Sequence, residues 1–390
     1  MRKFFRKIHL WLSIPFGVII TLTCFSGAML VFEKEVNEWI RPELYFVKQV
    51  KLTSIPVEEL LEKVATTLPD SVSVLSVSIS SDPNRAYQIS LSKPHRSSIY
   101  IDQYTGEVTG KNERSSFFMF MFRMHRWLLD SMNPGNKGVF WGKMIVGVST
   151  FVFVIVLISG IVIWWPRTRK AFKNSFKIAR QKGLRRFLYD LHVVGGMYAF
   201  LFLLAMSLTG LTWSFSWYRT AFYNLFGVEM TTQSQNRSVP TEKSIRKNRD
   251  ISLLNVKSEG SNMSPFVYWQ QVYDKLSTQD PQYKLITISS GNASVAHDFY
   301  GNQRAADRYS FNVLNGEIHK VDYYREQASN SKIRGWIYSV HVGSWGGIFT
   351  RLLSFFAALL GASLPLTGYY LFIKKSLKKK RRENVSDLSA

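Results

Sequence analysis

Four of the seven histidines in this chain lie at the ends of long apolar runs, where imidazole could ligate a metal or a haem iron. His9 and His192 each begin such a run, and a Ser-Gly or Thr-Gly pair follows 18 residues later, at Gly27 and Gly210. In an α-helix this separation is about 27 Å, close to the hydrocarbon thickness of a bilayer. Each helix would therefore carry a ligand at one membrane face and a bare backbone at the other, and a haem site needs both.

Pairing the four histidines by depth predicts two sites, each giving two axial imidazoles to one b-type haem. The expected pairs are His9 with His192 near the inner face and His125 with His341 near the outer face. A polar ring in a membrane helix needs a partner, so an interhelical hydrogen bond is the simpler interpretation of any single histidine. Four at equivalent points favour a shared cofactor role.

Glycines lie opposite the histidine end of each apolar run. They are Gly27 and Gly210 at outer depth, and Gly160 and Gly368 at inner depth. We expect them to leave room for a porphyrin edge, although small residues also serve plain helix packing.

Two cations are candidates to bind the haem propionates. Lys143 and Arg351 lie just inside the outer ends of two apolar runs, where a charge is costly unless it is paired. The alternative is that each side chain extends to lipid phosphate. Arg185 and Arg186, before His192, are interpreted chiefly as topology charges.

The remaining histidines carry no metal-like spacing, and surface or turn positions are expected for them: His95, His297 and His319. Cys24 is the only cysteine, which excludes internal disulfides, cysteine-ligated iron–sulfur clusters and thiol relays. No phosphate-binding loop, nucleophile elbow or zinc-protease motif is present. Redox chemistry in this chain would therefore depend on histidine-held cofactors.

Four segments are apolar enough to span a membrane, although the mean hydropathy of the chain is only −0.06. They are residues 10–32, 139–165, 191–217 and 347–373. The first continues past Cys24, so we expect a retained helix rather than a cleaved signal.

The positive charges predict the topology. The N-terminal stub, the segment 166–187 and the segment after Ile373 are strongly basic, whereas the two large segments between spans are nearly balanced. The positive-inside rule places both termini and the short loop in the cytoplasm and both large segments outside. The net charge of +23 is thus mostly a topology signal, with a contribution to binding anionic lipid, and nucleic-acid binding is not expected.

The chain reads as a two-fold repeat of span, outer α+β domain, span. The first outer domain shows a helix at Val57–Val64 and strands at Val74–Ser80, Tyr87–Leu91 and Ser98–Ile101. The second shows a helix near 266–276 and strands near 284–289 and 308–313. Residues 237–249 are polar and basic and are expected to form a linker. The division this predicts is 1–32, 33–138, 139–165, 166–187, 188–217, 218–346, 347–373 and 374–390.

Two turn motifs carry a family resemblance. The segment from Ser98 to Val108 resembles the terminal strand–turn–strand of a PepSY domain, and Tyr309 to Ile318 resembles a second one. Two such domains between four spans, with a histidine at each span, are similar to the PepSY-associated transmembrane family. That family includes bacterial inner-membrane ferric-siderophore reductases. The resemblance implies a di-haem inner-membrane protein with periplasmic domains, linked to iron uptake.

The function expected from these features is transmembrane electron transfer. Electrons would enter from a cytoplasmic or quinol donor, pass from the inner to the outer haem, and reduce a ferric siderophore or another ferric chelate held by the outer domains. The alternative is a membrane-anchored module whose PepSY-like domains bind or inhibit a protease, with histidines that only pack. A transporter has less support, because only Pro15 and Pro365 interrupt the spans.

Overall fold

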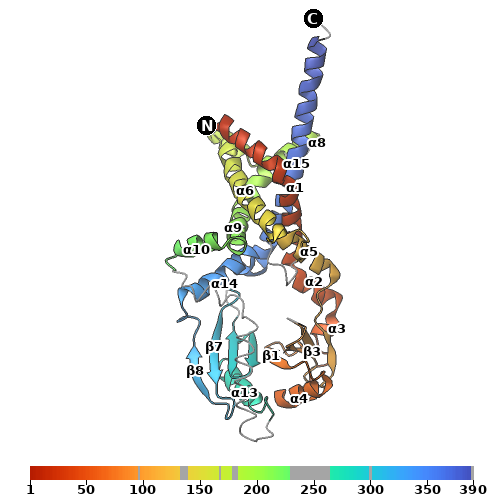
Figure 1. Cartoon of the computed structure of the whole chain (residues 1–390), viewed down its shortest axis with the longest axis vertical. Helices are drawn as coiled ribbons and strands as arrows, with labels where there is room; N and C mark the ends of the chain where they lie inside the picture. Colours follow the sequence, from red (N-terminus) through yellow and green to blue (C-terminus); the bar gives the residue numbers. More distant parts are fainter. Residues whose placement is uncertain are drawn as a thin grey trace. The chain divides into compact units, whose positions relative to one another are not determined.

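The chain forms two compact units in its computed structural model (Figure 1). The helical unit comprises Met1–Glu33, Ser115–Phe222 and Ile337–Ala390, and the sheet unit comprises Lys34–Arg114 and Tyr223–Trp336. The structure describes residues 1–94, 97–131, 139–166, 168–177, 183–228, 264–297 and 301–387. His95 and the expected linker at 237–249 lie outside these ranges.

Four helical segments are long and apolar enough to cross a membrane: Arg2–Val31, Trp141–Trp164, Leu184–Ser214 and Ser344–Lys378. Large apolar side chains stay exposed on all four of them, including Val18, Trp141, Leu201 and Phe349, each more than half exposed. A surface of this kind is expected where the solvent is lipid. The chain is therefore a membrane protein by its helices.

The helices of the helical unit follow these bounds: α1 (Arg2–Val31), α5 (Ser116–Trp127), α6 (Trp141–Trp164), α7 (Arg169–Asn174), α8 (Leu184–Asp190), the π-helical turn η1 (Leu191–Gly195), α9 (Gly196–Ser214), α10 (Ser216–Asn224), α14 (Ser329–His341), the 3-10 turn η2 (Ser344–Gly346) and α15 (Gly347–Asp387). Helix α1 packs on α6 and α15, and α9 packs on the same two helices. Ile20, Phe153, Leu203 and Ala357 join these helices in one buried cluster.

The spans differ from the sequence expectation in two places. The third is interrupted by the π-helical turn η1, which carries His192. The fourth does not end at Ile373: α15 continues to Asp387, so the basic segment that follows the apolar run is helical. Helix propensity explains this extension, because lysine and arginine favour helix as long as no glycine or proline stops it.

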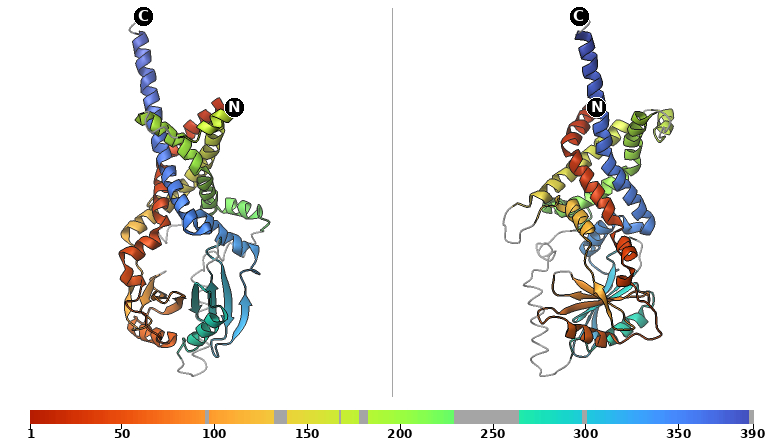
Figure 2. Two further views of the ribbon diagram at one scale, coloured as in Figure 1. Left: turned by 180° about the vertical axis from the view of Figure 1, so that it is seen from behind. Right: turned by 90° about the vertical axis from the view of Figure 1, so that its right-hand side faces the viewer.

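The sheet unit is built on one eight-stranded antiparallel sheet in the order β4-β3-β2-β1-β5-β6-β7-β8 (Figure 2). Its elements are α2 (Glu33–Ile40), α3 (Pro42–Tyr45), α4 (Val57–Thr67), β1 (Val74–Ser80), β2 (Tyr87–Leu91), β3 (Ser98–Ile101), β4 (Val108–Lys111), α13 (Trp269–Gln279), β5 (Leu285–Ser289), β6 (Asn292–Ala296), β7 (Ala306–Phe311) and β8 (Ile318–Asp322). The first three strands have the predicted bounds. Strand β6 was missed, because its small and polar residues give a weak strand signal.

In each half of the sheet unit a helix, α4 or α13, directly precedes four strands, and β1 pairs with β5 to join the halves. Their apolar side chains form one buried core, which includes Leu60 and Val64 from α4 and Val272 and Leu276 from α13. On the strands, buried and half-buried residues alternate, as in a sheet with one covered face. The two halves therefore share one core rather than folding around two.

The two predicted turns have the same hydrogen bonds. Gly106 N–H donates to the Asp102 carbonyl at 2.8 Å, and Gly316 N–H donates to the Asn312 carbonyl at 2.8 Å. The Asp102 and Asn312 side chains each accept from the backbone two residues on. Both glycines adopt positive φ, 71° and 69°, which disfavours other residues there.

We predict that the seam between β1 and β5 depends on its buried side. Ile286→Ala removes a fully buried side chain and should cost about 2–5 kcal/mol of stability. Hydrogen exchange of the β1 and β5 amides in the full-length protein measures this. Leu285→Ala, on the same strand but 37% exposed, is the matched control and should leave exchange nearly unchanged. Equal effects of the two variants would contradict a shared core at the seam.

Candidate metal centres

Each of the four histidines expected as ligands hydrogen-bonds through Nδ1 to a backbone carbonyl of another helix. The pairs are His9 with Val156 at 3.1 Å, His125 with Thr23 at 2.9 Å, His192 with Leu364 at 3.0 Å and His341 with Met206 at 2.9 Å. A carbonyl oxygen only accepts, so Nδ1 carries the proton in every ring. The nitrogen left to bind a metal is therefore Nε2 in all four.

Each of these carbonyls lies four residues before one of the four glycines, and the imidazole lies over that glycine. A Cβ added at Gly27 would lie 2.8 Å from Cε1 of His125, and one at Gly210 would lie 3.1 Å from Cε1 of His341. At Gly160 and Gly368 the distances to His9 and His192 are 3.5 and 3.4 Å. We call each Ser/Thr-Gly pair with its preceding carbonyl a histidine seat.

The seats give the glycines a contact that the sequence did not predict. Each of Gly27, Gly160, Gly210 and Gly368 lies against an imidazole from another helix, and their expected role beside a porphyrin edge stays a prediction. These contacts are reciprocal: His9 of α1 hydrogen-bonds to α6, and His125 of α5, which precedes α6, hydrogen-bonds to α1. Likewise His192 of η1 hydrogen-bonds to α15, and His341 of α14, which precedes α15, hydrogen-bonds to α9.

The seats bring the four histidines together in two pairs. His9 and His192 have ring centroids 6.2 Å apart, and His125 and His341 have centroids 6.0 Å apart. A metal held between two imidazoles requires about 6 Å, since metal–nitrogen bonds are about 2 Å and each nitrogen lies about 1 Å from its ring centre. In each pair the two imidazoles are therefore at a distance at which they could together hold one metal ion.

Burial keeps the outer pair in the neutral form that a ligand needs. It is the main cause that lowers the pKa of His341 to about 4, and the neighbouring His125 ring adds to the shift. Burial likewise lowers the pKa of His125 below its ordinary value. Both rings are thus uncharged at neutral pH, each with a lone pair on Nε2.

The two cations expected to bind propionates differ in the structure. The guanidinium of Arg351 donates to the Val31 carbonyl at 2.5 Å and lies 5.0 Å over the Phe32 ring. It therefore closes the C-terminal end of α1. Lys143 is half-buried in α6, and the charges that act on it come from Arg126 and Arg219.

Arg219 is a residue that the sequence did not single out. Its Nε is buried and has no hydrogen-bond partner. The charge of Arg126 also acts on both His125 and His341. The outer pair thus has one basic group acting on it, Arg126 of α5, and the charges of Arg126 and Arg219 act in turn on Lys143.

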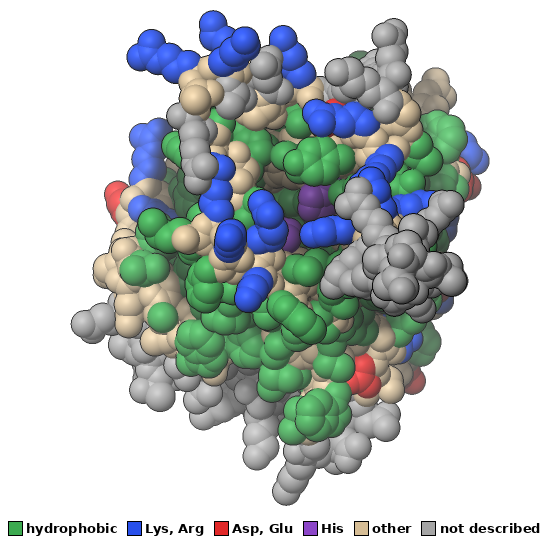
Figure 3. All heavy atoms as spheres, turned by 90° about the horizontal axis from the view of Figure 1, so that it is seen from above, with side chains coloured by type: hydrophobic (Ala, Val, Ile, Leu, Met, Phe, Trp, Pro, Cys, Tyr) green, Lys and Arg blue, Asp and Glu red, His purple; other side chains and the backbone are tan. Residues whose placement is uncertain are grey.

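Lys and Arg side chains gather at one end of the helical unit. Seen from the end that carries both termini, histidine side chains are visible at the bottom of a hollow bordered by Lys and Arg (Figure 3). Arg186 was interpreted as a topology charge, but it forms two contacts of 3.0 Å with Asp190, which is 2% exposed. This ion pair, in which Asp190 is buried and Arg186 is exposed, lies at the end of α8 directly before η1 and His192.

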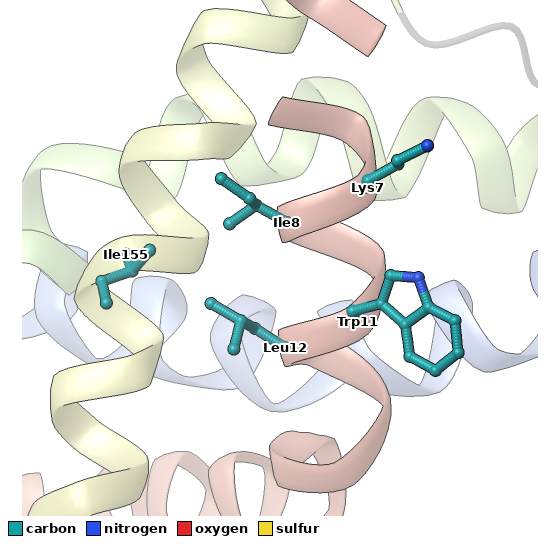
Figure 4. A pocket seen from close by; sticks show the side chains of 5 residues that line it. All are labelled: Lys7, Ile8, Trp11, Leu12 and Ile155. Atoms are coloured by element: carbon teal, nitrogen blue, oxygen red, sulfur yellow. The ribbon is translucent and has the colours of Figure 1, made fainter. Parts of the chain in front are cut away.

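An open apolar hollow lies beside the His9 helix (Figure 4). Its volume is about 480 Å³, and it is lined by Lys7, Ile8, Trp11, Leu12 and Ile155. The lining contains no carboxylate and no hydroxyl. It offers apolar contact and one ammonium group near the seat of His9.

The sheet unit holds the other described histidines. His319 is exposed, as expected. His297 is not a plain surface residue: its side chain is 13% exposed, and Nε2 lies 3.2 Å from Asp280 and 3.3 Å from Asp307. Among the described residues, no group of three or more His, Cys, Asp or Glu is placed to hold a metal ion.

The distances in the histidine seats predict that the four glycines differ in how well they tolerate substitution by alanine. Gly27→Ala would place a Cβ inside the contact distance of His125 and should disturb the outer pair, whereas Gly160→Ala meets His9 at ordinary contact distance. The optical spectrum of the protein prepared with haem should lose the outer site in Gly27→Ala and keep both sites in Gly160→Ala. Equal spectra for the two variants would leave these glycines as packing residues only.

Comparison with known proteins identifies the family to which the chain belongs. No curated protein matches the chain. The family model described as the PepSY-associated TM region matches residues 6–375, nearly the whole length. The family expected from the two turn motifs is confirmed, and the chain belongs to the PepSY-associated transmembrane family.

Proposed function

We propose that this protein is a transmembrane electron carrier that binds two b-type haems and reduces a ferric chelate. The observation that carries the proposal is the geometry of the two histidine pairs, each with centroids about 6 Å apart and every Nδ1 engaged. A lone histidine that only packs needs its hydrogen bond but not a second ring facing it. Haem would supply a one-electron Fe(III)/Fe(II) couple at each pair.

The residues of the helical unit would hold the group in place. His9 and His192 would bind one iron and His125 and His341 the other, through Nε2. The support for propionate binding at the outer pair is the charge of Arg126, which acts on both of its histidines and on Lys143. Arg351 is not proposed to bind a propionate, because its guanidinium already donates to the Val31 carbonyl at the C-terminal end of α1.

The proposed location is the bacterial inner membrane, with both termini in the cytoplasm and the sheet unit in the periplasm. Its support is the basic character of the two terminal segments and of residues 166–187. The two histidine pairs would then lie near opposite faces. A donor at the cytoplasmic face, or a quinol in the membrane, would supply the electron.

We also propose that the sheet unit consists of two PepSY-like domains and that the chain is an internal repeat. The equal order of one helix and four strands, and the equal turns at Gly106 and Gly316, support this. The reciprocal seats support it as well, since each half of the helical unit exchanges two histidines in the same way.

The proposed acceptor is a ferric siderophore or another ferric chelate. One electron converts bound Fe(III) to Fe(II), which hard-oxygen chelators hold more weakly, so the iron is released. The sheet unit could bind such a molecule through the face that carries Ser76, Ser78, Gln88 and Thr287. These half-buried side chains lie on adjacent positions of β1, β2 and β5. Their hydroxyl and amide groups suit hydrogen bonds to chelate oxygens.

Removal of single ligands tests the pairing. His9→Ala and His192→Ala should each remove the inner haem and spare the outer one, and His125→Ala and His341→Ala should do the reverse. Haem-to-protein stoichiometry with resolved optical spectra measures this, and His319→Ala is the control that should keep both haems. A wild-type protein without haem absorption, after expression with ample haem, would instead favour a protein-binding module. Loss of the same haem from His9→Ala and His125→Ala would show that the pairing is wrong.

Electron delivery tests the proposed acceptor. Reduced protein should be reoxidised by ferric siderophores in stopped-flow experiments, and ferrous iron should appear in a chelating trap. His341→Ala should stop this reaction while the inner site remains reducible, and His319→Ala should leave the rate unchanged. Reoxidation no faster than in buffer, with both hydroxamate and catecholate chelates, would remove the reductase assignment.

A further inference from the structure

Three of the four histidine seats contain a second acceptor for the imidazole. Besides the carbonyl, Nδ1 of His9 lies 3.0 Å from Ser159 Oγ, Nδ1 of His192 lies 2.9 Å from Thr367 Oγ1, and Nδ1 of His341 lies 3.2 Å from Thr209 Oγ1. Each hydroxyl belongs to the residue directly before the glycine of its seat. The contact therefore comes from the same turn of helix that admits the ring.

The hydroxyls accept from Nδ1 rather than donate to it. Nδ1 already carries its proton, because a carbonyl accepts from it. The hydroxyls donate to their own helices instead: Ser159 to Val156 O at 2.8 Å, Thr367 to Leu364 O at 2.8 Å and Thr209 to Ala205 O at 2.6 Å. Each of these three imidazole N–H groups is thus shared between two oxygens.

The fourth seat has the same sequence pattern without this contact. Ser26 precedes Gly27, but its hydroxyl donates to Leu22 O at 2.6 Å and to Thr23 O at 3.2 Å, and it is fully buried. The contact of Nδ1 of His125 in this seat is the Thr23 carbonyl at 2.9 Å. The four seats are therefore equal in backbone and unequal in hydroxyl contact.

We propose that Ser159, Thr367 and Thr209 are positioning residues that tune the reduction potentials of the two histidine pairs, with a stronger effect on the inner pair. This inference rests on the proposed binding of haem. Hydrogen bonds to the non-ligating nitrogen fix the ring and raise the basicity of the ligand. A more basic imidazole favours Fe(III) over Fe(II), so each contact lowers the potential of its site.

The hydroxyl contacts are distributed unequally between the two histidine pairs, so their effect on the two reduction potentials differs. Both ligands of the inner pair have a hydroxyl contact, through Ser159 and Thr367, whereas in the outer pair only His341 has one, through Thr209. The hydroxyls thus lower the inner potential more than the outer. This difference biases electron flow outward, from the cytoplasmic side to the side of the sheet unit.

Reduction potentials of the haem-loaded variants test the proposal. In Ser159→Ala and Thr367→Val the inner potential should rise, and in Thr209→Val only the outer potential should rise. A tenfold loss of preference for Fe(III) corresponds to a rise of about 59 mV in the reduction potential. The double variant of Ser159 and Thr367 should show roughly twice the single shift, and Ser159→Thr, which keeps the hydroxyl, should retain the wild-type potential.

Ser26→Ala is the matched control, since it removes a seat hydroxyl that does not contact a histidine. Both potentials should stay unchanged in this variant. A shift in Ser26→Ala as large as in Ser159→Ala would overturn the proposal, because it would reflect general helix packing. Unchanged potentials in Ser159→Ala and Thr367→Val with full haem content would also overturn it.

A haem-free measurement separates this inference from the proposed function. In protein labelled with ¹⁵N-histidine, Ser159→Ala should shift the Nδ1 resonance of His9, and Ser26→Ala should leave that of His125 unchanged. If the wild-type protein binds no haem, the proposed function is wrong. If it binds haem but the variants shift neither the reduction potentials nor the Nδ1 resonances, only the proposed role of the hydroxyls is wrong.

Discussion

The hydrogen bond from each histidine Nδ1 to a carbonyl of another helix is the interaction on which the helical unit depends. An imidazole placed in an apolar helix bundle must donate its proton, and the carbonyls of a regular helix are already used by that helix. A carbonyl can still accept a second hydrogen bond if the donor reaches it. Glycine four residues further on removes the side chain that would block the approach, as the 2.8 Å distance at Gly27 shows.

This constraint links packing to chemistry. Because Nδ1 is fixed by the backbone, Nε2 is left for a ligand, and because the seats are reciprocal, the rings meet in pairs. The same four contacts therefore join α1 to α5 and α6, and η1 and α9 to α14 and α15, while they orient the candidate metal ligands. The structural hydrogen bond through Nδ1 therefore leaves each ring able to bind a metal through Nε2.

The sheet unit follows a different principle. Its two halves join through β1 and β5 in one sheet, and α4 and α13 contribute to the same core. Backbone pairing across the seam satisfies strand edges that would otherwise be exposed. On the face of the sheet opposite the buried core, the central strands carry small hydroxyl side chains such as Ser78 and Thr287, which hydrogen-bond to each other at 2.9 Å.

The sequence by itself determined the elements that rest on local patterns. The four apolar runs, the strands β1 to β3 and the turns at Gly106 and Gly316 follow from periodicity and from residues with special backbone freedom. The grouping of the histidines into two pairs followed from their depth along the spans, because the length of a helix fixes where its ends lie.

Only the tertiary structure decided what each group touches. The sequence could not show that Gly27 and Gly160 seat imidazoles, that Arg351 caps α1, or that Ser159 contacts a histidine and Ser26 does not. Seats with the same Ser/Thr-Gly pattern differ because a side-chain contact depends on the approach angle of a neighbouring helix. The sheet order posed the same problem, since the pairing of β1 with β5 joins strands more than 200 residues apart and no local pattern records it.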